Sequence, residues 1–136
     1  MKKLLFVLFF VNACTFAYSQ KSEENQTLKP VVKFSETTHD FGNINETDGK
    51  VSCTFEVTNT GKAVLLITNV QGSCGCAVSE WSKTPIVPGK KGFIKVTYNP
   101  ENRPGTFNKT ITVSNNSDES PVSLFIKGNV VRNATK

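Results

Sequence analysis

Short segments of this chain alternate apolar and polar residues with a period of two, which is the pattern of a half-buried β-strand. In "VSCTFEVTN", Val51 to Asn59, Cys53 and Phe55 fall on an apolar face, while Thr54 and Glu56 fall on the opposite face. No segment beyond Pro30 shows the period of an amphipathic helix. The alternation therefore predicts an all-β fold.

Further strands are predicted on the same grounds, separated by turns rich in Gly, Pro and Asn. The first, Val31 to Ile44, is interrupted near a pair of threonines, and Pro85 to Gly92 is a turn-rich connection. About seven short strands predict a two-sheet β-sandwich of immunoglobulin-like type, with a closed barrel as the alternative. The remaining predicted strands are Ala63–Gly72, Phe93–Asn99, Thr106–Asn116 and Pro121–Val131.

The N-terminus predicts export. Two lysines precede the apolar run Leu4 to Val11, and Ala17-Tyr18-Ser19 offers a small-x-small cleavage site, so residues 1–19 are interpreted as a secretory signal peptide. The run is too short for a good membrane span, and we expect no transmembrane span in the mature chain. Lipid attachment at Cys14 is the less favoured alternative. The mature protein is thus expected to be periplasmic or secreted.

Cleavage after Ser19 would leave 117 residues, which is enough for one domain with a substantial core. Residues 20–32 are predicted to be a flexible linker, 33–131 the sandwich and 132–136 a tail. Loss of two lysines with the signal lowers the formal net charge from +5 to +3. The remaining basic residues are scattered rather than clustered, which argues against nucleic acid as a partner.

Three cysteines remain after cleavage, so at most one intramolecular disulfide can form. In "QGSCGCAVSEW", Cys74 and Cys76 flank Gly75. A strained Cys74–Cys76 ring, a bridge from Cys76 to Cys53, a Cu(I) or Zn(II) site and plain packing are all open interpretations. A structural role is favoured, because a zinc site would need Cys53 or His39 as further ligands.

Catalysis finds little support in the sequence. His39 is the single histidine, and we interpret it as a strand-end residue beside a turn that Asp40 caps and Gly42 makes. There is no sign of a Ser-His-Asp set or of a phosphate-binding loop, so we expect no enzyme activity and no cofactor. Trp81, the single tryptophan, is expected to pack in the sandwich, with contact to a partner as the alternative.

Five segments in order carry a family resemblance. The chain resembles the domain of unknown function 1573 family of exported bacterial proteins, from about Lys33 to Val131. The segments are "HDFGNI", "FEVTNTGKAVLLITNVQGSCGC", "PIVPGKKGFIKVTYNP", "GTFNKTITVSNN" and "LFIKGNV".

The resemblance implies an immunoglobulin-like domain of the group that includes major sperm protein, PapD-like chaperones and Hydin/ASH domains, which typically bind or scaffold. The family usually has Thr where this chain has Ala77, and no role for Cys53 carries over from it. The leading hypothesis is an exported, non-enzymatic module that binds another protein or an envelope component, with a sheet edge as the place where an envelope or secreted protein would pair. The alternative is a metal (Cu or Zn) or thiol redox protein that uses Cys74 and Cys76.

Overall fold

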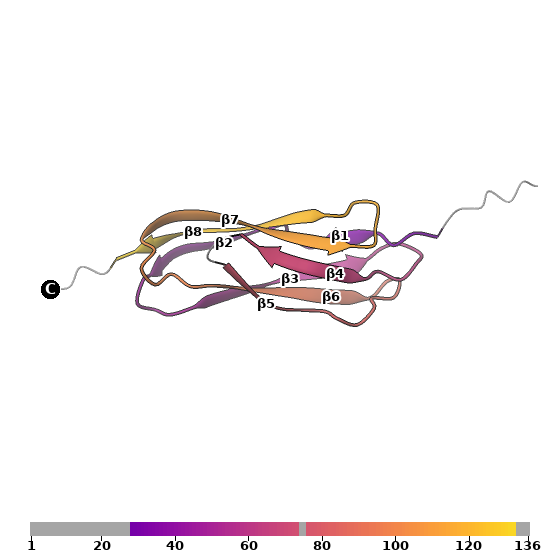
Figure 1. Ribbon diagram of the computed structural model, residues 1–136, viewed down its shortest axis with the longest axis horizontal. Coiled ribbons are helices and arrows are strands. Elements are labelled where there is room, and N and C mark those ends of the chain that lie inside the picture. Colours follow the sequence, from indigo (N-terminus) through magenta and orange to yellow (C-terminus); the bar gives the residue numbers. More distant parts are fainter. Residues whose placement is uncertain (1–27, 74–75, 133–136) are drawn as a thin grey trace, which may run out of the picture.

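The computed structural model describes residues 28–73 and 76–132, with the backbone alone for 76–79, and shows two four-stranded sheets packed face to face (Figure 1). One sheet has the order β1-β3-β6-β5 and the other β2-β8-β7-β4. The described residues contain no helix, and hence none that could cross a membrane. The all-β, two-sheet prediction is confirmed. The strands are β1 (Val32–Phe34), β2 (Thr38–Asn45), β3 (Val51–Asn59), β4 (Ile67–Gly72), β5 (Cys76–Trp81), β6 (Lys91–Tyr98), β7 (Gly105–Asn115) and β8 (Val122–Val131).

The predicted interruption of the first strand is the point where the chain changes sheets. β1 pairs antiparallel with β3, whereas β2 pairs parallel with β8 in the other sheet. All other pairs of neighbouring strands are antiparallel. The orders β1-β3-β6-β5 and β8-β7-β4 are those of the ABED and GFC sheets of immunoglobulin domains, and β2 is an additional strand beside β8. This arrangement agrees with the immunoglobulin-like interpretation, which stays a prediction.

One strand was not expected from the sequence. β5 follows the Cys-Gly-Cys motif directly and pairs with β6, from Cys76 opposite Tyr98 to Trp81 opposite Ile94. The pairing is irregular between Val78 and Glu80. Because the segment is short and its register shifts in the middle, it offers no clean alternation to read.

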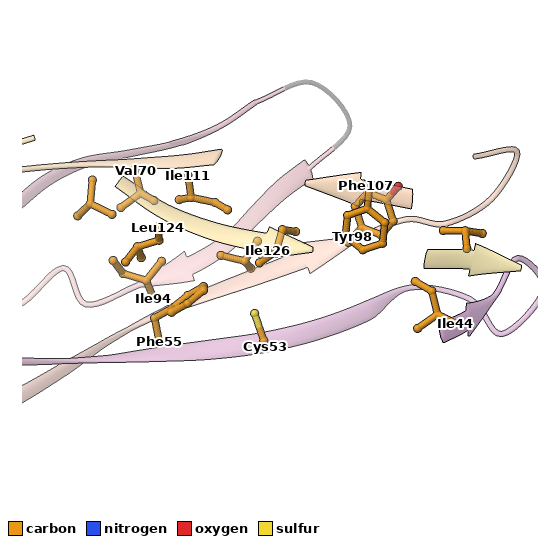
Figure 2. Packing of buried hydrophobic residues seen from close by; sticks show 13 residues of the cluster. Ile44, Cys53, Phe55, Val70, Ile94, Tyr98, Phe107, Ile111, Leu124 and Ile126 are labelled. Carbon is orange, nitrogen blue, oxygen red and sulfur yellow. The ribbon is translucent and has the colours of Figure 1, made fainter. Parts of the chain in front are cut away.

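The core lies between the sheets and follows the predicted alternation. Phe55 and Val57 on β3 are completely buried, as are Ile94 on β6 and Ile126 on β8. Figure 2 shows Phe55, Ile94 and Ile126 meeting from both layers, with the rings of Tyr98 and Phe107 stacked near one end. The two ring centroids are 4.0 Å apart. Apolar burial of this kind is the main stabilising contribution to such a domain.

Asn59 continues the inward alternation of β3, yet its side chain is polar and 0% exposed. Its amide group donates hydrogen bonds to the carbonyl oxygens of Ala63 (2.7 Å) and Ile86 (2.8 Å). Its side-chain oxygen accepts from the backbone N–H of Gly61 (3.0 Å) and, more weakly, of Val31 (3.4 Å). Every hydrogen-bonding group of this buried amide is therefore used, as burial of a polar side chain requires.

We expect Asn59→Ala to lower the free energy of unfolding by about 2–4 kcal/mol, because two buried carbonyl groups lose their donors. Asn115→Ala is the matched control. Asn115 is also buried, but the only hydrogen bond that its side chain makes among the described residues is to the Ser117 N–H. Urea unfolding of both variants measures the difference. Equal losses would contradict the special role of Asn59.

Candidate functional site

Cys53 lies in the hydrophobic core rather than at a reactive site. It sits on the inner face of β3, carries a free thiol and is 8% exposed. Burial, assisted by the negative charge of Glu36, raises the pKa of the Cys53 thiol to about 11. Since the thiolate is the nucleophile and the metal ligand, a buried thiol with this pKa is unsuited to either role.

The Cys-Gly-Cys motif joins the two sheets. It connects the end of β4 to the start of β5, which belongs to the opposite layer. Cys74 and Gly75 lie outside the described residues, as does the side chain of Cys76, so the ring, metal and redox interpretations of the pair stay predictions. The signal peptide and Cys14 lie outside the described residues as well.

The backbone register does bear on a bridge between Cys76 and Cys53. Cys53 pairs with Val96 of β6, whereas Cys76 pairs with Tyr98 of β6 from its other side. The two cysteines thus lie on strands separated by β6, about 9.5 Å apart at the strand spacing of a sheet. Disulfide-linked Cα atoms lie within about 7 Å. This arrangement leaves Cys53 unbridged.

His39 lies on β2, away from any cluster of metal-binding side chains. Its Nδ1 atom is 3.5 Å from a carboxylate oxygen of Glu36, and its ring packs edge-on against Phe41 at 4.6 Å. The described residues hold no group of three His, Cys, Asp or Glu side chains able to bind a metal ion. The metal set of Cys53, His39 and the Cys-Gly-Cys pair stays a prediction, because Cys74 and the side chain of Cys76 lie outside the described residues.

The turn after His39 is built as the sequence predicts. The backbone N–H of Gly42 donates to the Asp40 carboxylate at 2.8 Å, and Gly42 adopts a positive φ of 66°. This bond, together with the nearby Lys127, holds the pKa of Asp40 below its ordinary value. The β2–β8 register shifts between Asp40 and Asn43, so the turn is a bulge within the strand. Asp40 thus has a structural role.

Trp81 combines packing with partial exposure. The indole ring is half-buried against the core cluster, and the Lys83 ammonium group lies 3.0 Å from its centroid. Its ring N–H is buried without a hydrogen-bond partner among the described residues. Packing as the main role of Trp81 agrees with these contacts, whereas the Lys83 cation covers part of the ring that a partner would need.

A hollow of about 530 Å³ lies beside Arg103 and Lys109. It contains no histidine, cysteine or carboxylate. Its remaining lining residues are Tyr98, Pro104, Thr106, Phe107 and Asn108.

The sheet edges are the remaining candidates for a binding site, because an edge strand presents unpaired N–H and C=O groups. β1 has three residues, one of them a lysine, and β2 carries an Asp40–Lys127 ion pair of 3.6 Å as well as its bulge. β5 carries the exposed Glu80. β4, "ITNVQG", has no charged residue. Its register shifts only at its start, between Ile67 and Asn69.

β4 is the outermost strand of its sheet, with β7 as its one partner there. Val70 points into the core, whereas Asn69 and Gln71 are exposed. Within the described chain, β4 is therefore an uncharged edge strand with polar, neutral side chains on its outer face. Charge, the commonest protection of natural edge strands against pairing, is absent from it.

The segment that leads into β4 is held in extended form on both sides. Leu65 and Ile86 exchange backbone hydrogen bonds of 2.9 Å. On the opposite side, Asn116 accepts from the Leu66 N–H through its side-chain oxygen (2.8 Å) and donates to the Val64 carbonyl (3.0 Å). Sequence reasoning missed Asn59 and Asn116 as organisers of this region. For Asn59 a signal existed, since it falls in phase with the inward residues of β3.

The family model described as "Protein of unknown function (DUF1573)" matches residues 32–130, and the chain belongs to this family. The resemblance seen in the sequence is thereby confirmed. No curated protein matches the chain.

Solved structures show similar folds at low sequence identity. A protein of unknown function from Porphyromonas gingivalis is 17% identical, with a TM-score of 0.63 over 75% of this chain and 47% of that protein. The secreted serine protease VesC from Vibrio cholerae is 16% identical (TM-score 0.58, 81% of this chain, 25% of VesC). The VesB protease of Vibrio cholerae is 13% identical (TM-score 0.57, 73% and 31%). The chain spans less than half of each, and the likeness shows the fold alone.

We expect the high pKa of Cys53 to make the folded protein less stable as the pH rises. The thiol ionises near pH 9 when unfolded but only near pH 11 when folded, so its stabilisation is complete below pH 9 and is lost towards pH 11. The loss should be on the order of 2 kcal/mol. Urea unfolding of the wild type and of Cys53→Ala across this range isolates the effect. Parallel pH profiles for the two proteins would contradict it.

Proposed function

We propose that this protein is an exported, non-enzymatic binding module that receives an extended segment of another envelope or secreted protein as an additional strand on β4. The observation that carries the proposal is the uncharged edge of β4, in contrast to the charged or very short edges β1, β2 and β5. Strand addition of this kind gains affinity from main-chain hydrogen bonds and specificity from alternate side chains.

The apolar run at the N-terminus supports export, because it has the length and flanks of a secretory signal. A role without catalysis is supported by the surroundings of the single histidine, which contacts Glu36 in the link between β1 and β2 and Phe41 on its own strand. The fold also supports a binding role, because a packed sandwich holds an edge strand in a fixed conformation with which a partner strand can pair in register.

A photo-crosslinking residue tests the proposal when it is placed at Gln71 of the full-length chain and expressed in the native host. Thr112 is the matched control, since it is also exposed and pairs with Gln71 from the inner strand β7. We expect a discrete crosslinked protein from Gln71 and none from Thr112, because only the β4 edge would lie beside the partner strand.

Introducing a charge at the edge gives the second arm of this test. Gln71→Lys should abolish the crosslinked product formed from a probe at Asn69, while Thr112→Lys should leave it intact, since charge at an edge opposes strand addition. Crosslinks of equal yield from Gln71 and Thr112, or insensitivity to Gln71→Lys, would overturn the proposal.

A further inference from the structure

The end of the sandwich at which β1 starts (Figure 1) is the end to which most of the exposed large apolar residues belong. The loops between β3 and β4 and between β5 and β6 meet the first described residues there, tied together by Asn59. Of the six large exposed hydrophobic side chains in the described residues, only Phe93 belongs to one of the eight strands. The other five are Leu28 (61%), Val31 (41%), Val64 (40%), Leu66 (40%) and Val87 (46%).

Three of these five form one patch beside the start of β4. Leu65 and Ile86, the bridged pair, both point into the core, with 0% and 4% exposure. In extended chain their neighbours point outward, so Val64 and Leu66 from one segment and Val87 from the other share a face. We call Val64, Leu66 and Val87 the apolar patch. It adjoins β4, because Leu66 directly precedes Ile67, the first residue of that strand.

The Leu65–Ile86 bridge sets one limit of the open edge. Leu65 already exchanges backbone hydrogen bonds with Ile86, so a partner strand cannot pair with it. β4 ends at Gly72, and the next strand along the chain, β5, belongs to the other sheet. The open edge is therefore β4 itself, six residues long, with the apolar patch at its first end.

The absence of charged residues along this edge indicates which kind of partner segment it would bind. From Ala63 to Ser79 the sequence contains no Asp, Glu, Lys or Arg. A charged residue in a partner segment would find no countercharge along β4, and one placed over the apolar patch would be desolvated without compensation. An apolar side chain placed there would instead cover the exposed area of Val64, Leu66 and Val87.

We propose that the segment received by β4 is a neutral, extended peptide that runs antiparallel to β4 and ends, at its C-terminal side, in apolar residues that cover the apolar patch. Antiparallel pairing is the more stable form, and it places the C-terminal end of the segment beside Ile67. This inference rests on the proposed function and adds the partner's sequence chemistry and direction.

Selection of peptides from a displayed random library on the full-length chain tests this inference. Selected sequences should be uncharged, with apolar residues concentrated at their C-terminal end. Fluorescence anisotropy then compares their affinity for the wild type, the edge variant Gln71→Lys, the patch variant Val64→Ser with Leu66→Ser, and the charge control Thr112→Lys. We expect the patch variant to weaken binding about tenfold or more, and Thr112→Lys to leave it unchanged. Thermal unfolding checks that each variant is folded.

The outcomes separate the two proposals. This inference would be overturned if the selected peptides lose binding with Gln71→Lys but show no apolar bias at their C-terminal end. It would also be overturned if such peptides bind the patch variant normally. In either case the proposed strand addition on β4 would still hold. Apolar residues concentrated at the N-terminal end would overturn the antiparallel direction. Binding that depends on the patch but not on Gln71, or no selected peptide at all, would overturn both proposals.

Discussion

The buried amide of Asn59 is the interaction on which one end of this sandwich depends. Four hydrogen bonds join its side chain to backbone groups of three separate segments, the N-terminal entry, the β3–β4 turn and the β5–β6 loop. An unpaired amide at this depth would cost far more than a surface one, so the three segments hold a single arrangement. That arrangement sets Leu65 against Ile86 and so fixes where β4 becomes an open edge.

An exposed edge strand can pair with another chain and cause aggregation, and the four edge strands of this sandwich are protected to different degrees. β1 is short, and β2 is bulged at Gly42 and carries an ion pair. β4 lacks such charges and is flanked by exposed apolar side chains. A strand in this state either invites aggregation or serves a specific partner. The short length of β4 and its closure by the Leu65–Ile86 bridge restrict what can pair there, which favours a specific partner.

Much of the fold was readable from the sequence because burial imposes a period of two on every strand. The alternation in β3 placed Cys53, Phe55 and Val57 inside, and all three are buried. β5 was not predicted from the sequence, because its register shifts within six residues and its sequence shows no regular alternation. Of the candidate site residues, Asp40 and Gly42 behave as turn residues, as predicted. The phase of β3 signals that Asn59 is buried, but the partners of Asn59 and Asn116 are long-range contacts, which sequence spacing does not predict.

The sequence by itself determined the β class, the inward faces of the strands and the family, since each follows from local alternation or from motifs in order. Only the tertiary structure decided which strands became edges, because that depends on pairing between segments distant in the chain. It likewise separated Cys53 from Cys76 by an intervening strand and brought Val87 beside Val64. A strand's exposure at an edge is a property of its neighbours, and the neighbours are chosen by the packing of the whole domain.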